Sequence, residues 1–273
     1  MNNRQELSYS LKQKMDKKEF IVVAGVSSLS QVRCCQTENC DLILLYPDSK
    51  AGKAQNPFLA GYLPFGNTND AMIRTASEVM PIIDSKNILA GLNGSDPFKL
   101  DHLLIHRMKQ FHFAGIHNYP AMTLVDGVFG TNIDSLNLGI DKEITLLKHA
   151  MQEDLFTCAM VRSKKQIHAM LKSGVEMLIF YLGLGERETV RSGKKQMQYI
   201  SYLKELTEAA RKINPHIPLL FFDEQITAID EIHKIAKAVP DINGYCLLPV
   251  TRSDYSHTRL SLEIKQLKRI SLT

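Results

Sequence analysis

The chain has 273 residues, of which 44% are hydrophobic and 23% are charged, and its net charge is +4. These shares are those of a soluble globular protein with a sizeable core. A length prior of about 150 residues per domain suggests two domains, but α/β barrels fill roughly 200 to 250 residues as one. Lys and Arg are mixed with Asp and Glu along the chain, so composition gives no support for nucleic-acid binding.

The first residues lack the apolar core of a signal peptide, and no apolar run reaches about 18 residues. We therefore expect a cytoplasmic protein without a membrane partner. The five cysteines are an odd number and form no CxxC motif, which argues against a disulfide framework or a zinc site. Cys158 and Cys246 stand inside apolar runs and are expected in the core.

In the first half, Leu7, Leu11 and Met15 recur at a spacing of four among charged residues. This pattern predicts an amphipathic N-terminal helix over residues 2–18 that covers the bottom of the main domain. Short apolar runs then alternate with helical patterns. The predicted strands are 20–26, 41–46, 87–92 and 114–118, and the predicted helices end near 37 or cover 69–80 and 97–110.

The second half repeats this alternation. The predicted strands are 156–161, 177–184, 218–222 and 244–248, and the predicted helices are 142–152, 164–172, 195–212, 228–238 and 258–269. Eight strands that alternate with helices predict an α/β fold, a (β/α)8 TIM barrel with an additional N-terminal helix. We expect a single domain over residues 1–273, with an N-terminal helix at 1–19, a barrel core at 20–250 and a terminal helix at 256–270.

A doubly wound open sheet is the alternative fold. A nucleotide-binding sheet of that kind needs a glycine-rich phosphate turn after its first strand. The sequence AGVSSLS at residues 24–30 matches such a turn poorly. The barrel is therefore the preferred prediction.

In a barrel, the residues at the end of each strand share one mouth, where small-molecule chemistry takes place. These residues are Asp48, Asn93, Asp96, His117, Asn118, Asp126, Arg162, Gly183, Gly185, Asp223, Glu224, Thr251, Arg252 and Ser253. Most also have a structural interpretation: Asp96 before Pro97 is suited to cap a helix, and Asn118 and Asp126 are suited to turns. A lone histidine such as His117 is more often a hydrogen-bonded structural group than a general base.

Two charged features in this set point to ligands. Asp223 and Glu224 are adjacent carboxylates, a pair that can hold a hard cation, although capping of a helix explains one of them. Arg252 lies beside two hydroxyl residues after the last strand, where barrels often hold phosphate.

Three segments carry a family resemblance: LAGYLPFGNTND at 59–70, AGLNGSDPF at 90–98 and GIHNYPAMTLVDGVFGTN at 115–132. Together they resemble the phosphoenolpyruvate hydrolase-like family of TIM-barrel proteins, which is related in fold to phosphonopyruvate hydrolase and isocitrate lyase. The resemblance in spacing extends over about residues 21–249. It implies a barrel that binds a small phosphorylated or carboxylated keto acid, with magnesium as a candidate cofactor. The implied reaction is cleavage of a phosphorus–carbon or phosphorus–oxygen bond by water.

The positions at the strand ends, together with the resemblance, assign roles to the mouth residues. The expected catalytic residues are Asp96, Asp126 and Asn118; the expected substrate-binding residues are Asn93, His117, Arg162, Gly183 and Arg252; the expected metal ligands are Asp96, Asp126 and Glu224. Asn118 would orient the substrate, and Arg162 or Arg252 would neutralise its carboxylate or phosphate.

The chain departs from the family pattern after the second, sixth, seventh and eighth strands, where glycine- and serine-rich runs are replaced. The acidic pair at 223–224 would repel an anion where backbone amides usually bind one. Two hypotheses result: a hydrolase or lyase that acts on a phosphorylated or phosphono keto acid, and a catalytically silent ligand-sensing or protein-interaction barrel. The terminal helix is apolar on more than one face, which predicts a homo-oligomer.

Overall fold

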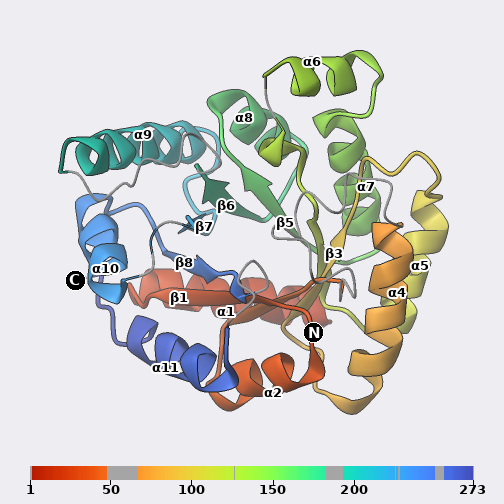
Figure 1. Ribbon diagram of the computed structural model, residues 1–273, viewed down its shortest axis with the longest axis horizontal. Helices are drawn as coiled ribbons and strands as arrows, with labels where there is room; N and C mark the ends of the chain where they lie inside the picture. Colours follow the sequence, from red (N-terminus) through yellow and green to blue (C-terminus); the bar gives the residue numbers. More distant parts are fainter. Residues whose placement is uncertain are drawn as a thin grey trace.

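The computed structural model of the chain describes residues 2–47, 67–125, 127–182, 193–224, 226, 228–249 and 255–272. Parallel strands β1 to β8 pair in chain order, and β1 pairs with β8 to close a barrel. Figure 1 shows the strands at the centre of a ring of helices. The strands are β1 (Ile21–Val26), β2 (Leu42–Leu45), β3 (Ile88–Leu92), β4 (Gly115–Asn118), β5 (Phe156–Val161), β6 (Met177–Tyr181), β7 (Leu219–Phe222) and β8 (Gly244–Leu247). The predicted (β/α)8 fold is confirmed.

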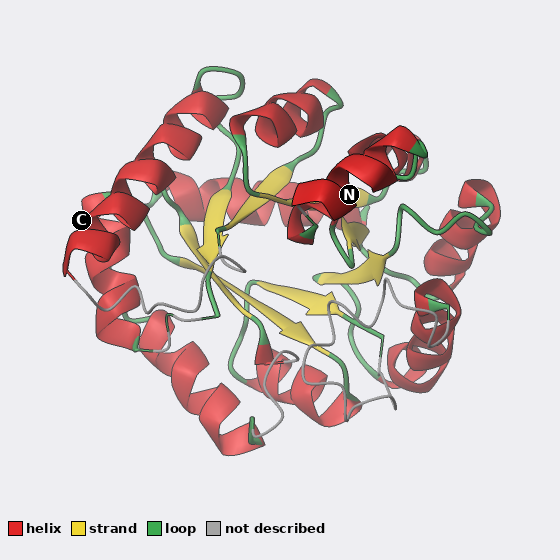
Figure 2. Ribbon diagram, turned by 45° about the horizontal axis from the view of Figure 1, so that its top comes forward, coloured by secondary structure: helices red, strands yellow, loops and turns green. Residues whose placement is uncertain are grey.

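Helices surround the strands on the outside of the molecule (Figure 2). They are α1 (Asn3–Asp16), α2 (Leu29–Thr37), α4 (Thr68–Val79), α5 (Asp101–Gln110), α6 (Gly127–Ser135), α7 (Ile140–Gln152), α8 (Lys164–Lys172), α9 (Gly193–Arg211), α10 (Ile229–Ala238) and α11 (His257–Leu267). Two short 3-10 helices are also present: η1 (Met80–Ile82) follows α4, and η2 (Met122–Leu124) follows β4. Among the described residues, no helix is both long and apolar enough to cross a membrane.

Every strand residue is buried, because strand side chains alternate between two apolar environments. Val22 and Ala24 of β1 pack against the helices, whereas Ile21 and Val23 face the barrel interior. The same alternation places Cys158 and Cys246 in the interior, and both are buried free thiols, as expected.

Helix α1 closes the bottom of the barrel, as its apolar spacing predicts. Its N-terminus is held by a capping box in which Asn2 and Gln5 bond each other's backbone amides. Leu7 and Leu11 are buried in the same cluster as the barrel interior. In Figure 1, α1 crosses the ring of strands.

Helix α5 begins later than expected, and the prediction that Asp96 caps it is wrong. The helix starts at Asp101, and its N-cap residue Leu100 makes no side-chain cap hydrogen bond. Asp96 Oδ1 instead accepts a 2.9 Å hydrogen bond from the backbone amide of Phe98 in the preceding turn. The aspartate therefore acts within the loop, because the chain turns once more before it becomes helical.

Two differences appear in the helical layer. Helix α6 was not expected from the sequence; it stands outside the ring in Figure 1 and has no buried side chain. In α11 the apolar residues Leu260, Ile264 and Leu267 are buried, and Leu262 is exposed. The terminal helix thus uses most of its apolar surface inside the chain, and the homo-oligomer stays a prediction without this support.

Candidate functional site

The floor of the barrel mouth is an aromatic layer around Tyr46. The Tyr46 hydroxyl lies 3.1 Å from Nε2 of His117, and the Tyr46 ring packs 4.1 Å from the Tyr119 ring, centroid to centroid. His117 is fully buried, and burial lowers its pKa to about 3 although the Cys158 backbone opposes the shift. A neutral imidazole that contacts Tyr46 supports the floor, and its predicted contact with substrate stays a prediction.

Three neighbouring strands end in a cation, a phenol and a carboxylate. Arg162 follows β5, Tyr181 ends β6, and Glu224 comes two residues after β7. Burial raises the pKa of Tyr181, and the Glu224 and Asp223 carboxylates raise it further while Arg162 lowers it. These side chains therefore interact at one side of the mouth. Arg162 and Glu224 are both half-buried.

Asn118 faces the helical layer and not the mouth, because it stands next to the inward-facing His117 in β4. Its Nδ2 donates to Glu143 Oε2 at 2.8 Å and to the Met160 carbonyl at 3.3 Å, and its Oδ1 accepts from the Met160 amide at 2.8 Å. Both amide protons and the oxygen are therefore used inside the protein. The role of Asn118 in orienting substrate stays a prediction.

Glu143 is a buried carboxylate that was not among the residues expected at the site. It lies in the first turn of α7 and is 1% exposed. Burial raises its pKa to about 7, although hydrogen bonds from Asn118 and the Met122 amide lower it. A signal for it exists in the sequence, because Glu143 shares a helix face with the buried residues Leu146, Leu147 and Ala150.

Asp96 and Asn93 belong to a second network, at the end of β3 and the start of α4. Asp96 Oδ2 accepts from the side-chain amides of Asn67 at 2.8 Å and Asn69 at 3.0 Å. Asn69 also bonds both the amide and the carbonyl of Asn93, which is buried. The two family segments around residues 67–70 and 93–96 are thus joined by side-chain hydrogen bonds.

The expected metal ligands are not brought together in the described part of the chain. Asp96 follows β3 and Glu224 follows β7, and three strands separate β3 from β7 on either side of the ring. Both oxygens of Asp96 already accept hydrogen bonds. The described residues include no group of three His, Cys, Asp or Glu side chains suited to hold a metal. They do not fit a magnesium ion, and the third expected ligand, Asp126, lies outside them together with Gly183 and Arg252.

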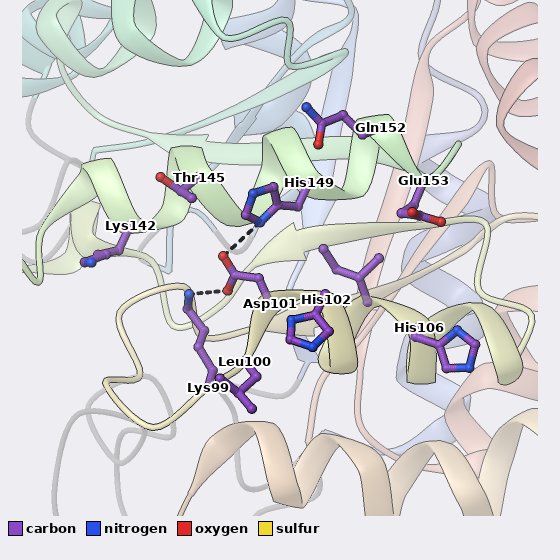
Figure 3. Close-up of a pocket in the computed structure, with 11 residues that line it drawn as sticks. Lys99, Leu100, Asp101, His102, His106, Lys142, Thr145, His149, Gln152 and Glu153 are labelled. Atoms are coloured by element: carbon purple, nitrogen blue, oxygen red, sulfur yellow. Dashed lines mark hydrogen bonds and ion pairs between the residues drawn. The ribbon is translucent and has the colours of Figure 1, made fainter.

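A pocket of about 540 Å³ lies away from the mouth, on the outer surface between α5 and α7 (Figure 3). Asp101 lies between the two helices, where it accepts from His149 Nδ1 at 3.0 Å and from Lys99. His102 and His106 line the α5 side. No residue expected to bind substrate lines this pocket, so it is separate from the candidate site.

The fold and the mouth define this chain as a (β/α)8 barrel of the kind that places its ligands at the carboxyl ends of the strands. The chain belongs to the phosphoenolpyruvate hydrolase-like family, whose sequence profile matches residues 6–263.

Relatives with assigned names are distant and longer. The tomato (Solanum lycopersicum) ToMV susceptible protein tm-1(GCR26) is 24% identical and aligns with 96% of this chain and 35% of its own length. The tomato ToMV resistance protein Tm-1(GCR237) is 23% identical over 100% of this chain and 36% of its own length. The putative transcriptional regulatory protein y4pA of Sinorhizobium fredii is 22% identical over 90% of this chain and 41% of its own length. The chain therefore spans about a third of the tomato proteins.

Solved structures agree on the fold. A crystal structure of 2,3-dimethylmalate lyase, a member of the PEP mutase/isocitrate lyase superfamily, has a TM-score of 0.57 at 14% identity and covers 98% of this chain and 85% of its own. Tryptophan synthase of Mycobacterium tuberculosis has a TM-score of 0.58 at 12% identity, with 98% of each chain covered. At these identities the likeness concerns the barrel fold alone.

Proposed function

We propose that this barrel is a hydrolase or lyase that acts on a small phosphorylated or phosphono keto acid at its mouth. The observation that carries the proposal is the convergence of Arg162, Tyr181 and Glu224 from three neighbouring strands. A fixed cation beside a proton donor and a proton acceptor suits a substrate that is anionic and changes its protonation during the reaction. Membership of the phosphoenolpyruvate hydrolase-like family supports the substrate class.

The three residues suggest a division of roles for a phosphono keto acid. Arg162 binds the carboxylate or phosphonate, and Glu224 accepts a proton from the attacking water. The oxygen of that water forms the new bond to phosphorus, the phosphorus–carbon bond breaks, and its electron pair forms the enolate of the keto acid. The enolate then takes a proton at the carbon that lost phosphorus, supplied by Tyr181 or by protonated Glu224, which gives phosphate and the keto acid.

The other expected residues that the structure describes support the mouth in this proposal. Asn93 and His117 shape the floor and wall of the mouth, and Asn118 acts from behind β4. Asp126, Gly183 and Arg252 lie outside the described residues. Magnesium stays a prediction that depends on Asp126, and the proposed reaction proceeds through the side chains of this protein alone.

A second candidate function is a ligand-sensing barrel without turnover. Asp96 and Asn118, two of the expected catalytic residues, use their polar atoms in internal hydrogen bonds, which favours a structural role for both. The printed name of the y4pA relative, a putative transcriptional regulatory protein, is in line with sensing. In this case the mouth would bind a keto acid through Arg162 and release it unchanged.

The deciding experiment measures pyruvate and phosphate release from phosphonopyruvate and from phosphoenolpyruvate, with and without magnesium. The proposal predicts release by the natural chain and its loss in Arg162→Gln. Arg33→Gln, which removes an exposed arginine on α2, is the matched control and should retain turnover. Turnover that survives Arg162→Gln contradicts the proposed site. Binding by calorimetry without any product favours the sensing barrel.

A further inference from the structure

The buried carboxylate of Glu143 holds the turn after β4. Its Oε1 accepts a 2.6 Å hydrogen bond from the backbone amide of Met122, the first residue of η2. Its Oε2 accepts the 2.8 Å bond from Asn118 at the end of β4. Gly94 lies so close that a Cβ there would stand 2.6 Å from the Cα of Glu143. The carboxylate is therefore fixed between a helix, a strand end and a turn.

The other side of the same turn holds Arg162. The Thr123 carbonyl accepts from Arg162 Nη1 at 3.4 Å. Gln166 Oε1 accepts both from the Thr123 hydroxyl at 3.1 Å and from the Arg162 backbone amide at 2.8 Å. Thr123 is thus the residue through which the turn contacts the guanidinium and its backbone. A shift of Met122 moves these contacts, since the two residues are adjacent in one 3-10 turn.

We propose that Glu143 is a positioning residue for Arg162: through the Met122–Leu124 turn it holds the guanidinium in the place where an anionic ligand binds, and this binding changes when Glu143 takes up a proton. The inference rests on the proposed function for its ligand, a small carboxylate or phosphate. The contact between Glu143 and the turn does not depend on that ligand.

Protonation of Glu143 weakens its contacts because a neutral carboxyl group accepts hydrogen bonds less strongly than a carboxylate. The two affected bonds come from the Met122 amide and the Asn118 amide group. A hydrogen bond to a charged group contributes about 1.5–3 kcal/mol and one to a neutral group about 0.5–1.5 kcal/mol, so the turn is held less tightly when Glu143 is protonated. The bond to the Met122 amide is the one that fixes the position of Thr123, because the two residues are adjacent in η2.

The surroundings of Glu143 allow it to titrate near neutrality. Burial raises its pKa to about 7, and no charged side chain contributes to the shift. Titratable residues on the elements packed against α7 face elsewhere or have partners of their own. His117 and Cys158 face the barrel interior. Asp101 pairs with Lys99 and His149, and Lys164 pairs with Glu205. The other titratable residues of α5 and α8 lie on the outer surfaces of these helices: His102, His106, Arg107, Lys109, Lys165, His168 and Lys172.

The first test is a pH titration of the ligand-free natural chain by NMR. The Met122 amide and the Arg162 side-chain signals should move together, with one midpoint near the pKa of about 7 that burial gives Glu143. In Glu143→Gln neither signal should show this midpoint, whereas Glu78→Gln, on the exposed side of α4, should titrate as the natural chain does. The proposal is overturned if the Arg162 signals do not change with pH at the midpoint that the Met122 amide shows.

The second test measures binding of oxalate by calorimetry between pH about 6 and 8, a range in which both of its carboxylates stay ionised. We expect affinity in the natural chain to rise roughly tenfold across this range, the change that 1.4 kcal/mol produces. Glu143→Gln should give a flat, weak profile. An unchanged slope in Glu143→Gln contradicts the proposal.

A third variant separates this inference from the proposed function. Gln166→Leu removes the bridge between Thr123 and Arg162 without touching Glu143. Met122 should still titrate, and Arg162 should follow it less. If oxalate does not bind but Arg162 still follows Met122 in the natural chain, the anion site fails while the positioning role stands. If oxalate binds with a slope that both Glu143→Gln and Gln166→Leu leave intact, the positioning role fails while the anion site stands.

Discussion

Asn118 Nδ2 donates a 2.8 Å hydrogen bond to Glu143 Oε2, and this bond joins the end of β4 to the first turn of α7 across the boundary between sheet and helices. Both side chains are buried. Asn118 also bonds the backbone amide and carbonyl of Met160 in β5. One asparagine therefore links two strands and a helix beneath the mouth, and a change in it affects the shape of the mouth from behind.

Replacing Asn118 with Ala should destabilise the protein by about 2–4 kcal/mol. The substitution leaves the Glu143 carboxylate with one donor and the Met160 backbone without side-chain partners, and unpaired buried polar groups are unfavourable by about 1–3 kcal/mol each. Urea unfolding followed by circular dichroism measures the change. Asn132→Ala on the exposed helix α6 is the control and should alter stability by less than about 0.5 kcal/mol. Equal stability of the two variants would contradict the structural role of Asn118.

The pH dependence of stability should change when Glu143 is replaced with Gln. The folded pKa of about 7 is above the ordinary value of 4.5, so folding favours the protonated form. The contribution to stability is fully present below pH 4.5 and is lost as the pH rises to about 7. Across this pH window the free energy of unfolding of the natural chain should fall by up to about 3 kcal/mol relative to that of Glu143→Gln. Above the window the difference between the two free energies should be constant. Unfolding curves at a series of pH values, compared with Glu78→Gln, measure this; parallel curves would be incompatible with a buried carboxyl of raised pKa.

His117 should act in the opposite direction. Burial lowers its pKa from 6.5 to about 3, so the folded state keeps it neutral while the unfolded chain takes up a proton. The contribution of His117 to stability is fully present above pH 6.5 and is lost as the pH falls towards 3. This contribution is up to about 5 kcal/mol. His117→Gln should remove this acid slope, and His168→Gln on the exposed face of α8 should retain it. A His117→Gln variant that unfolds in acid along the same slope as the natural chain would show that folding does not lower the pKa of His117.

The sequence predicts the barrel well because its strands are short, apolar and separated by amphipathic helices. The first strand was expected at 20–26 and lies at Ile21–Val26, and Ser28 caps the helix that follows it. Helix α5 was placed four residues too early, because Pro97 is a common first residue of a helix while here it belongs to a turn held by Asp96. Such a turn depends on contacts with Asn67 and Asn69, which are distant in the sequence.

The site is less predictable because it depends on which way each residue at a strand end points. His117 and Asn118 are adjacent, yet one lies beneath Tyr46 inside the barrel and the other bonds to Glu143 behind it. Composition and motif spacing treat them alike, whereas the alternation of the strand separates them. Glu143 was missed because it lies in a helix and not after a strand, although an acidic residue on an apolar helix face indicates a buried carboxylate.

A structural role and a catalytic or metal-binding role for Asp96 predict different results for Asp96→Asn. Its Oδ2 accepts from Asn67 and Asn69 and its Oδ1 accepts from the Phe98 amide, so the amide nitrogen of an asparagine faces at least one donor in either orientation. We therefore expect a loss of about 1–2 kcal/mol of stability, since at least one hydrogen bond is broken, with turnover falling only as the folded fraction falls. Asp70→Asn makes the same chemical change at an exposed site in α4 and should leave both quantities unchanged. Thermal unfolding and pyruvate release, measured on the same samples, decide between the interpretations. Abolished turnover at unchanged stability would support a catalytic or metal-binding role for Asp96.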